Sequence, residues 1–481
     1  MNSLIRDISK VRLSTLVLVL CLSFTSCSDS FLQAIPETDL SDASAFDTPA
    51  RILSQVNGIY GSAKNGNFLG GRYLIYNDIR GEEFVNRTTN SVTGYSVYQG
   101  NPDPADTYVA GFWNQGYLTI NRINLFLEGI AANSGKIDAT LAAQYSAEVK
   151  FIRALTYFSL VQIFAKPYVL DNGASPGLPL RLIGETSGAN SQLKRSTVAQ
   201  VYDQILKDLN EAEGALPDDY ASALLRTTRA HKNTAIALKT RVLLAKKDYA
   251  GVLTEGNKIV SASAPFKSPN RVAHELQADV VSVFRTPYTS VESIFSFPMA
   301  ETNAPGTQNQ LGYYFNFGNL EYVLNNSGAG ILANTNWSLV DDRRAKLTAQ
   351  YTTLGRHPLK FSGVSPFLDY VPNIRYAEVL LNIAEAEAES GSLVRARALL
   401  EAIRNRSDAT YQFGTLDKAG LIEAILLERR IELLAEGFRT NDVLRRGQPI
   451  NSFGAGGLIQ PTSDNYIYGI PLTEQQTNPG L

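Results

Sequence analysis

Only two cysteines occur in the 481 residues, which excludes a disulfide framework. Cys21 lies in the apolar stretch 13–24, which follows several basic residues and is short for a membrane span. We therefore interpret residues 1–26 as an export signal. Its removal leaves Cys27 as the only cysteine, so we predict that Cys27 is lipidated and tethers the protein to a membrane. The alternative is an ordinary secretory signal in which Cys27 has no role.

Charge of one sign and long apolar runs are also missing. The 44 basic and 46 acidic residues nearly cancel, so no polybasic surface for nucleic acid is expected. No later apolar run approaches the roughly 18 residues of a membrane-spanning helix. The three histidines, His231, His274 and His357, are not at ligand spacing, so zinc is unsupported, and nothing argues for calcium. Hydrolase elbows, phosphate loops and dinucleotide fingerprints are absent, and we predict no cofactor and no catalytic residue.

Helical periodicity is the main positive signal of the sequence. Small and apolar residues in two helix pairs, at 230–260 and 375–406, fall at the offsets of a tetratricopeptide unit. We predict a mainly α fold, in which tetratricopeptide-like helical pairs form a partial superhelical scaffold, with long irregular loop insertions and little β structure. The predicted scaffold stretches are residues 50–60, 111–165, 196–261 and 373–447.

Two intervening stretches, residues 61–110 and 262–372, have a different composition. Glycine or proline interrupts them repeatedly, and many of the 23 tyrosines of the chain occur there. Irregular loops of this kind often carry recognition sites. Because both would be insertions into one helical frame, we predict a single binding surface built from distant parts of the sequence.

Charged clusters near the C-terminus have a structural interpretation. Glu428, Glu432 and Glu436 recur at intervals of four, and such a stripe needs arginines to neutralise it. We interpret it as an ion-pair network rather than a catalytic dyad. The segment 341–344, Asp-Asp-Arg-Arg, is interpreted as a helix cap and solvated turn rather than a metal site.

Motifs spread from Cys27 to Leu481 carry a resemblance to a known family. The most distinctive are Ala147-Glu148-Val149-Lys150-Phe151-Ile152-Arg153-Ala154 with Tyr157-Phe158, Trp113-Asn114-Gln115-Gly116-Tyr117, Arg195-Ser196-Thr197-Val198, Ile374-Arg375-Tyr376-Ala377-Glu378, Glu428-Arg429-Arg430-Ile431-Glu432-Leu433 with Glu436-Gly437-Phe438-Arg439, and Tyr468-Gly469-Ile470-Pro471. Because these motifs follow one another along the sequence as they do in the family, the chain resembles the SusD/RagB outer-membrane lipoproteins of the Bacteroidetes.

The resemblance implies a surface-exposed, lipid-anchored protein of the outer membrane. Such proteins bind a nutrient, mostly an oligosaccharide and in some members a peptide, and deliver it to a SusC-like TonB-dependent transporter. The matching motifs belong to the scaffold and specify no ligand-binding residue. We accordingly expect one SusD-like domain over residues 27–481, without enzymatic activity.

Aromatic residues in the two loop-rich stretches are the candidate ligand site. Pyranose rings present apolar C–H faces that stack on aromatic rings, and their hydroxyls need polar partners nearby. The alternative for each ring is that it packs a loop against the scaffold. The candidates are Tyr95, Tyr98 and Tyr108, near Arg87, Asn90 and Asn101, and Tyr313, Tyr314, Tyr322 and Trp337, near Asn316 and Asn336.

Three other functions remain as alternatives. A peptide-binding member of the same family would use the same surface. A glycoside hydrolase would need two carboxylates about 5–10 Å apart in a cleft, and no such pair stands out in the sequence. A pure adaptor would hold a protein partner on its tetratricopeptide-like units and bind no small ligand.

Overall fold

A computed structural model describes residues 44–188, 191–316, 320–351 and 353–481. Leu53–Leu481 form one compact unit, and residues 44–52 belong to a separate unit. Cys27 and the predicted export signal lie outside the described residues. Within the described ranges, no helix is both long and apolar enough to span a membrane.

Helices dominate the structure, which confirms the predicted fold class. Strands are short, and those within the described ranges form four two-stranded antiparallel sheets. The helices are α3 (Pro49–Ala63), α4 (Arg72–Ile79), α5 (Tyr95–Tyr98), α6 (Thr107–Ala132), α7 (Ala139–Phe164), α8 (Val198–Ala215), α9 (Ala223–Thr228), α10 (Lys232–Ala245), α11 (Tyr249–Gly256), α12 (Leu311–Phe315), α13 (Asp342–Ala345), α14 (Tyr376–Ser390), α15 (Leu393–Ser407), α16 (Lys418–Glu432), α17 (Arg439–Arg445) and α18 (Leu472–Thr477). The sheets pair β1 (Phe84–Asn86) with β3 (Tyr322–Leu324), β2 (Ser293–Phe297) with β6 (Val371–Arg375), β4 (Thr348–Tyr351) with β5 (Gly355–Pro358), and β7 (Ile450–Ser452) with β8 (Gly457–Ile459).

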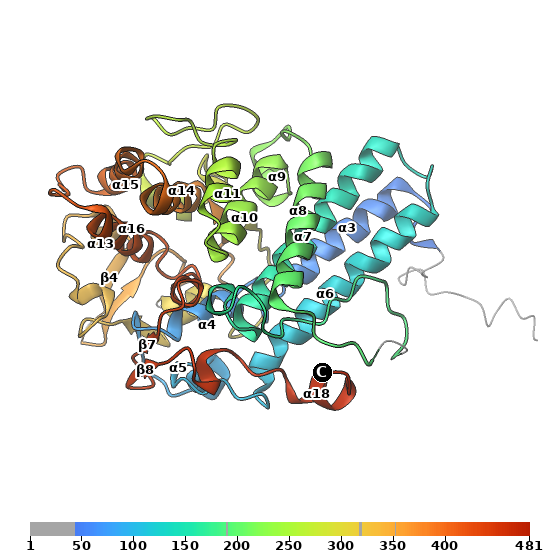
Figure 1. Ribbon diagram of the computed structural model, residues 1–481, viewed down its shortest axis with the longest axis horizontal. Helices are drawn as coiled ribbons and strands as arrows, with labels where there is room; N and C mark the ends of the chain where they lie inside the picture. Colours follow the sequence, from blue (N-terminus) through green and yellow to red (C-terminus); the bar gives the residue numbers. More distant parts are fainter. Residues whose placement is uncertain (1–43, 189–190, 317–319, 352) are drawn as a thin grey trace, which may run out of the picture. The chain divides into compact units, whose positions relative to one another are not determined.

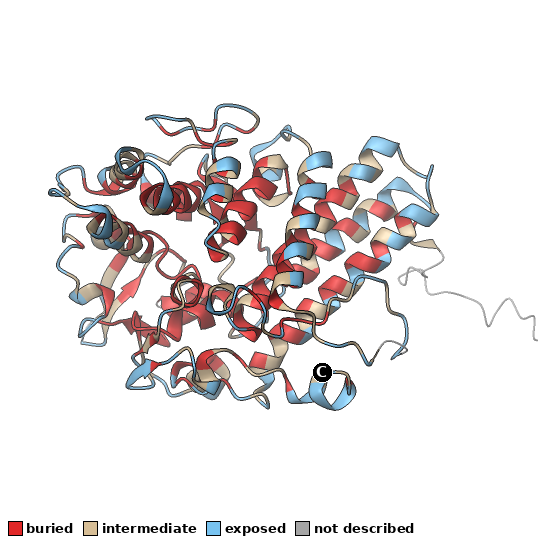
Figure 2. Cartoon of the chain, in the orientation of Figure 1, coloured by how far each residue is buried: buried red, intermediate tan, exposed pale blue. Residues whose placement is uncertain are grey.

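The long helices form a stack in which each packs on the next. Helix α6 contacts α7, α7 contacts α8, α8 contacts α10, α10 contacts α11, and α11 contacts α14. Helix α14 in turn contacts both α15 and α16 (Figure 1). The two predicted tetratricopeptide-like pairs, α10–α11 and α14–α15, are far apart in the sequence but pack together through α11 and α14. Stacking of this kind buries the apolar face that a single pair leaves open. The helices are accordingly buried where they face each other and exposed on their outer sides (Figure 2).

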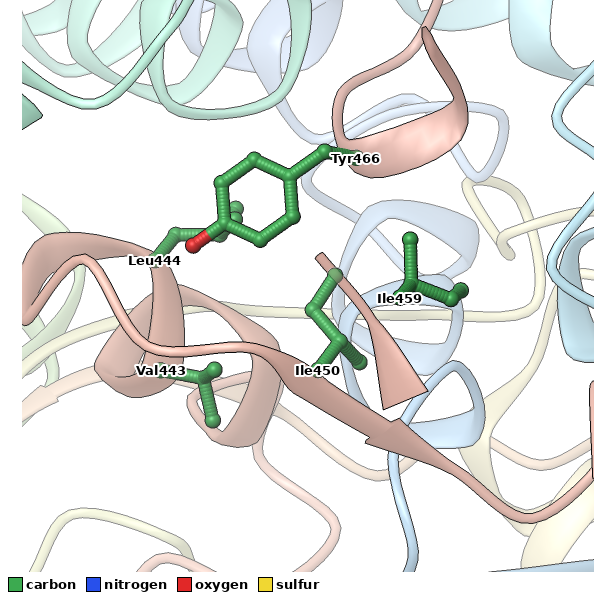
Figure 3. Packing of buried hydrophobic residues seen from close by; sticks show 5 residues of the cluster. All are labelled: Val443, Leu444, Ile450, Ile459 and Tyr466. Atoms are coloured by element: carbon green, nitrogen blue, oxygen red, sulfur yellow. The ribbon is translucent and has the colours of Figure 1, made fainter. Parts of the chain in front are cut away.

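Side-chain caps set where several of these helices begin. Thr197 accepts a hydrogen bond from the backbone of Gln200, and the Gln200 side chain bonds back to the Thr197 backbone, which completes a capping box for α8. At the C-terminal side, α17 packs on the β7–β8 hairpin through a small apolar cluster (Figure 3). The cluster is formed by Val443, Leu444, Ile450, Ile459 and Tyr466.

The stretch 61–110 is more ordered than its composition indicates. All eight residues of α4 are buried, including Asn77 and Asp78, so this helix has no exposed polar face. Asp78 accepts hydrogen bonds from the backbone N–H groups of Gly437 and Arg439, which satisfies its carboxylate in the interior. A helix without amphipathic periodicity is not recognised from the sequence, and the prediction of an irregular region is wrong here.

The glutamate spacing predicted an ion-pair network, and the structure shows one that is buried and holds the C-terminal helices to the second loop-rich stretch. The network consists of five acidic and five basic side chains. The N–O distances in its ion pairs are at most 2.9 Å, as between Arg375 and Glu432. Burial disfavours the charged acid, but Arg406, Arg375 and Arg343 hold the pKa of Glu432 well below its usual range. The acids are Glu292, Asp341, Glu428, Glu432 and Glu436, and the bases are Arg343, Lys360, Arg375, Arg404 and Arg406.

The segment 341–344 differs from its predicted role in one respect. Asp341 caps α13 as expected, because its carboxylate accepts a hydrogen bond from the backbone of Arg343. The turn is not solvated, however. Asp341 and Arg343 are buried, and Arg343 binds Glu428 and Glu432 of α16. The arginine is directed inward because the glutamate stripe requires a counter-charge there.

Replacing Arg375 by Met tests how much this network contributes to stability. The change leaves three buried carboxylates without one of their partners, and loss of one member of such a network costs about 3–5 kcal/mol. Lys346→Met is the control, because it removes only an exposed pair with Asp342, which contributes about 1 kcal/mol or less. Urea denaturation of both variants should reproduce this difference, and equal stabilities would contradict it.

Two histidines that are distant in the sequence meet in the interior. His231 precedes α10, and its ring stacks on that of His274 with centroids 5.5 Å apart. One ring nitrogen of His274 is 3.0 Å from the Val291 carbonyl oxygen, to which its N–H donates. Burial lowers the pKa of His231 to about 3 and that of His274 to about 4. Both rings are therefore neutral at pH 7.

This pair should make the protein less stable as the pH falls. Below about pH 6.5 both histidines are protonated in the unfolded chain but stay neutral in the folded protein. The free energy of unfolding therefore falls from there toward pH 3, by at most about 1.4 kcal/mol per histidine and pH unit. We expect the double variant His231→Gln/His274→Gln to lose about 2–4 kcal/mol less than the wild type between pH 7 and pH 5. Denaturation curves at the two pH values measure this, and identical losses would refute the assignment.

Candidate ligand-binding site

The two loop-rich stretches lie against each other, as the idea of one composite surface requires. β1 from the first pairs with β3 from the second, and Arg87 donates a hydrogen bond of 3.0 Å to the carbonyl of Leu320. A side chain at Gly66 or Gly71 would collide with the backbone of the segment 305–309. Glycine therefore permits a close approach at this contact.

Aromatic rings from both stretches form a continuous row across this contact. Neighbouring ring centroids are 5.8–6.2 Å apart, in the range where aromatic pairs attract each other. We call this set the aromatic row, and it joins loops that no helix or long strand connects. Its members, in order, are Tyr95, Tyr98, Tyr322, Tyr314, Tyr313 and Phe367.

The middle of the aromatic row is buried. Tyr314 and Tyr322 have no exposed surface, and Tyr98 is 7% exposed. The hydroxyl of Tyr322 donates to the carbonyl of Thr93, and burial raises the pKa of Tyr322 well above its usual value. These three rings hold the two loops together, and in this conformation they offer no face on which a sugar could stack.

Trp337 is not part of the aromatic row. Its side chain is 1% exposed, and the guanidinium of Arg344 lies over its ring, 5.4 Å from the centroid. Arg344 also donates a hydrogen bond of 2.6 Å to the Trp337 carbonyl. Trp337 therefore packs its loop against the interior, which is the alternative considered for each ring, and it is not available to a ligand in this conformation.

Three of the seven predicted rings remain half-buried, and each has a polar side chain beside it. The amide of Gln99 donates to the hydroxyl of Tyr95 at 3.1 Å, and that of Gln308 donates to Tyr313 at 3.3 Å. The third half-buried ring, Tyr108, has the guanidinium of Arg72 4.2 Å from its centroid. We call these the three ring–polar pairs.

Hydrogen bonds connect the ring–polar pairs with one another. Ser96, next to Tyr95, donates to the carboxylate of Asp106, and that carboxylate caps α6 by accepting from the backbone of Tyr108. On the other side, Arg72 approaches the carbonyl of Gln308 at 3.4 Å. The three pairs are therefore held by one frame.

The polar partners differ from those that the sequence suggested. Asn90 caps a short turn through the backbone of Val92, and the amide of Asn316 donates to the carbonyl of Phe361. Arg72, Gln99 and Gln308 were missed, because only the fold brings Arg72 to Tyr108 and Gln308 to Tyr313. Gln99 is four residues from Tyr95, so its helical spacing was the one available signal.

Nothing in the described ranges points to bound metal. No three histidine, cysteine, aspartate or glutamate side chains in that part of the chain are grouped in a way that could hold an ion. At the ring–polar pairs, the nearby carboxylates have structural partners. Asp106 caps α6, and Glu321 accepts a hydrogen bond of 2.9 Å from Thr93.

Comparison with known proteins places the chain in a family. Residues 30–244 match a family described as starch-binding and associating with the outer membrane, and residues 360–478 match the SusD family. A solved SusD superfamily protein from Bacteroides fragilis is 31% identical and has a TM-score of 0.83, covering 91% of this chain and 99% of that one. The chain belongs to the SusD/RagB family.

Two further relatives extend the comparison. SusD-like protein P2 of Formosa agariphila is 25% identical, and the match covers 96% of this chain and 97% of that protein. A solved laminarin-binding SusD-like protein has a TM-score of 0.71 at 20% identity, covering 90% of this chain and 98% of that one. The second similarity shows a shared fold.

Alanine substitutions should separate the structural rings from the candidate binding rings. Tyr322→Ala removes a wholly buried ring and its hydrogen bond, and we expect it to cost about 3–5 kcal/mol of stability. Tyr95→Ala removes a half-buried ring at the end of the row and should cost less than about 2 kcal/mol. Urea denaturation measures both, and a larger loss for Tyr95→Ala would show that the row is anchored at that end.

Proposed function

We propose that the protein captures a nutrient oligosaccharide at the outer membrane and delivers it to a SusC-like TonB-dependent transporter. The observation that carries this proposal is the set of three ring–polar pairs. Two of them combine a half-buried aromatic ring with an amide, and the third combines the half-buried ring of Tyr108 with the guanidinium of the buried Arg72. Sugar recognition needs this combination of an apolar face and a hydrogen-bonding group.

The family supports the nutrient-binding part of the proposal. The first matching family is described as starch-binding, and one solved relative is a laminarin-binding protein. The same family description supports an outer-membrane location, with Cys27 as the proposed lipid attachment site. Acyl chains on this residue would hold the domain at the membrane without a spanning helix.

Binding without catalysis fits the chemistry of the site. Hydrolysis of a glycosidic bond requires one carboxyl group as acid and a second as base or nucleophile. Asp106 and Glu321, the carboxylates described at the ring–polar pairs, are engaged in a helix cap and a loop contact. The proposed role of this surface is therefore to hold a sugar chain.

The triple variant Tyr95→Ala/Tyr108→Ala/Tyr313→Ala tests the proposed surface. Each aromatic–sugar stack contributes about 0.5–1.5 kcal/mol, so we expect affinity for a bound glycan to fall about tenfold or more. Calorimetric titration with neutral glucose hexasaccharides of β-1,3, α-1,4 and β-1,4 linkage measures this. Tyr249→Ala, which changes a half-buried tyrosine on the scaffold helix α11, is the control.

Three results would contradict parts of the proposal. Unchanged affinity in the triple variant would exclude the ring–polar pairs as the site. Release of new reducing ends during incubation would replace binding with hydrolysis. Binding of peptides by a protein that binds none of the glycans would change the cargo class.

A further inference from the structure

A large cavity lies apart from the aromatic row, beside α16 and α17. Its volume is about 890 Å³, within the range of roughly 300–1,000 Å³ typical of ligand pockets. The loop 411–416, which connects α15 to α16, forms one wall. None of the seven aromatic residues singled out from the sequence lines it, although Asn336, next to Trp337, does.

The wall formed by this loop presents two aromatic rings in a fixed arrangement. Tyr411 and Phe413 are half-buried, with centroids 4.9 Å apart and planes at 69°. Behind them, the wholly buried guanidinium of Arg404 lies 4.2 Å from the Tyr411 ring and 5.5 Å from the Phe413 ring. Arg404 also binds Glu428 of the ion-pair network, so the support under these rings is anchored in the core.

A second arginine fixes the backbone of the same loop. Arg397 donates hydrogen bonds to the carbonyl oxygens of Phe413 and Gly414, the latter at 2.8 Å. The loop is therefore already ordered, and it loses little conformational entropy when a ligand binds. Rigid binding surfaces of this kind gain affinity because they are already ordered.

The arginines that line the cavity are paired with carboxylates, and the lining carboxylate Glu423 is exposed. Arg430 is 2.6 Å from a carboxylate oxygen of Glu83, and Arg446 is 2.7 Å from one of Glu385. Arg439, the third arginine of the lining, binds Glu82. Because each guanidinium has a counter-charge, the cavity does not concentrate positive charge for a polyanion.

The remaining polar lining is rich in amides. Asn336, Gln412 and Gln448 are exposed, Asn334 is half-buried, and all four border the cavity. An amide side chain both donates and accepts hydrogen bonds, as a sugar hydroxyl does. Aromatic faces, amides and paired charges together match an uncharged, polyhydroxylated ligand better than a charged or purely apolar one.

We propose that this cavity is a second ligand site, which binds a neutral oligosaccharide through stacking on Tyr411 and Phe413. Its amide lining provides the hydrogen bonds to the sugar hydroxyls, and its volume accommodates more than one pyranose ring. The inference goes beyond the proposed function, because this surface is separate from the ring–polar pairs. A ligand can bind in the cavity whether or not the ring–polar pairs bind one.

Tryptophan fluorescence gives a readout next to this cavity. The chain has two tryptophans, and Trp113 is buried in the helical scaffold beside Phe164. Trp113→Phe leaves Trp337, next to the cavity-lining Asn336, as the only reporter. We expect neutral glucose hexasaccharides of at least one of the three linkages to change this fluorescence saturably.

Two variants then test the named residues in the Trp113→Phe background. Tyr411→Ala/Phe413→Ala should weaken the response about tenfold or more, by loss of both stacks. Ala424→Phe should abolish it, because Ala424 lines the cavity and a large ring there occupies the space, adds no tryptophan and leaves the aromatic wall intact. The variant Tyr95→Ala/Tyr108→Ala/Tyr313→Ala, made in the same background, should give the same fluorescence titration as the Trp113→Phe parent. The two proposed sites can therefore fail independently of each other.

Three outcomes overturn the proposal. The first is no saturable change of fluorescence with any of the neutral hexasaccharides. The second is an unchanged titration of both cavity variants. The third is tighter binding of a hexagalacturonate than of every neutral hexasaccharide, which would replace an uncharged ligand with an anionic one.

Discussion

Ten buried charges in one closed network connect the helical scaffold with the loops that carry the candidate sites. Glu292 and Arg375 come from the region of the β2–β6 sheet, Arg343 from α13, Glu428 and Glu432 from α16, and Glu436 from the turn after it. Burying a charge is costly unless its partners remain in place. The network therefore fixes the positions of these loops, on which both candidate ligand-binding surfaces depend.

The network and the aromatic row stabilise different contacts. The network joins the second loop-rich stretch to the scaffold through paired charges. The aromatic row joins the second stretch to the first through stacked rings and the β1–β3 pairing. The row is buried in the middle and half-buried at its ends. The buried rings, which stabilise the contact between the loops, therefore also support the half-buried rings of the candidate site.

Helical periodicity made the scaffold predictable, whereas the loops depended on three-dimensional contacts. The apolar spacing of the pairs α10–α11 and α14–α15 is a local property of the sequence and does not depend on the rest of the fold. The existence of these helix pairs and the way their helices pack therefore follow from local sequence. The contact between these two pairs, across a long intervening segment, could not be inferred from either pair alone. Helix α4 was missed because burial on all sides removes the polar face that reveals a helix.

The candidate site was predictable in its general location but not in its residues. Tyrosine-rich composition correctly indicated two loops that meet. It could not distinguish Tyr322, which is buried, from Tyr95, which is half-buried, because both stand in similar local sequences. The cavity beside α16 was not foreseen, since its lining is gathered from the distant segments 334–336, 411–430 and 439–449.

The close approach at Gly66 and Gly71 has a consequence for how this architecture can diversify. Any side chain at either position would force the segment 305–309 away and separate the two loops. The tips of the loops are free of that restriction, since their rings meet solvent. Residues at the tips can therefore be exchanged, while a few positions without a β-carbon keep the underlying geometry constant.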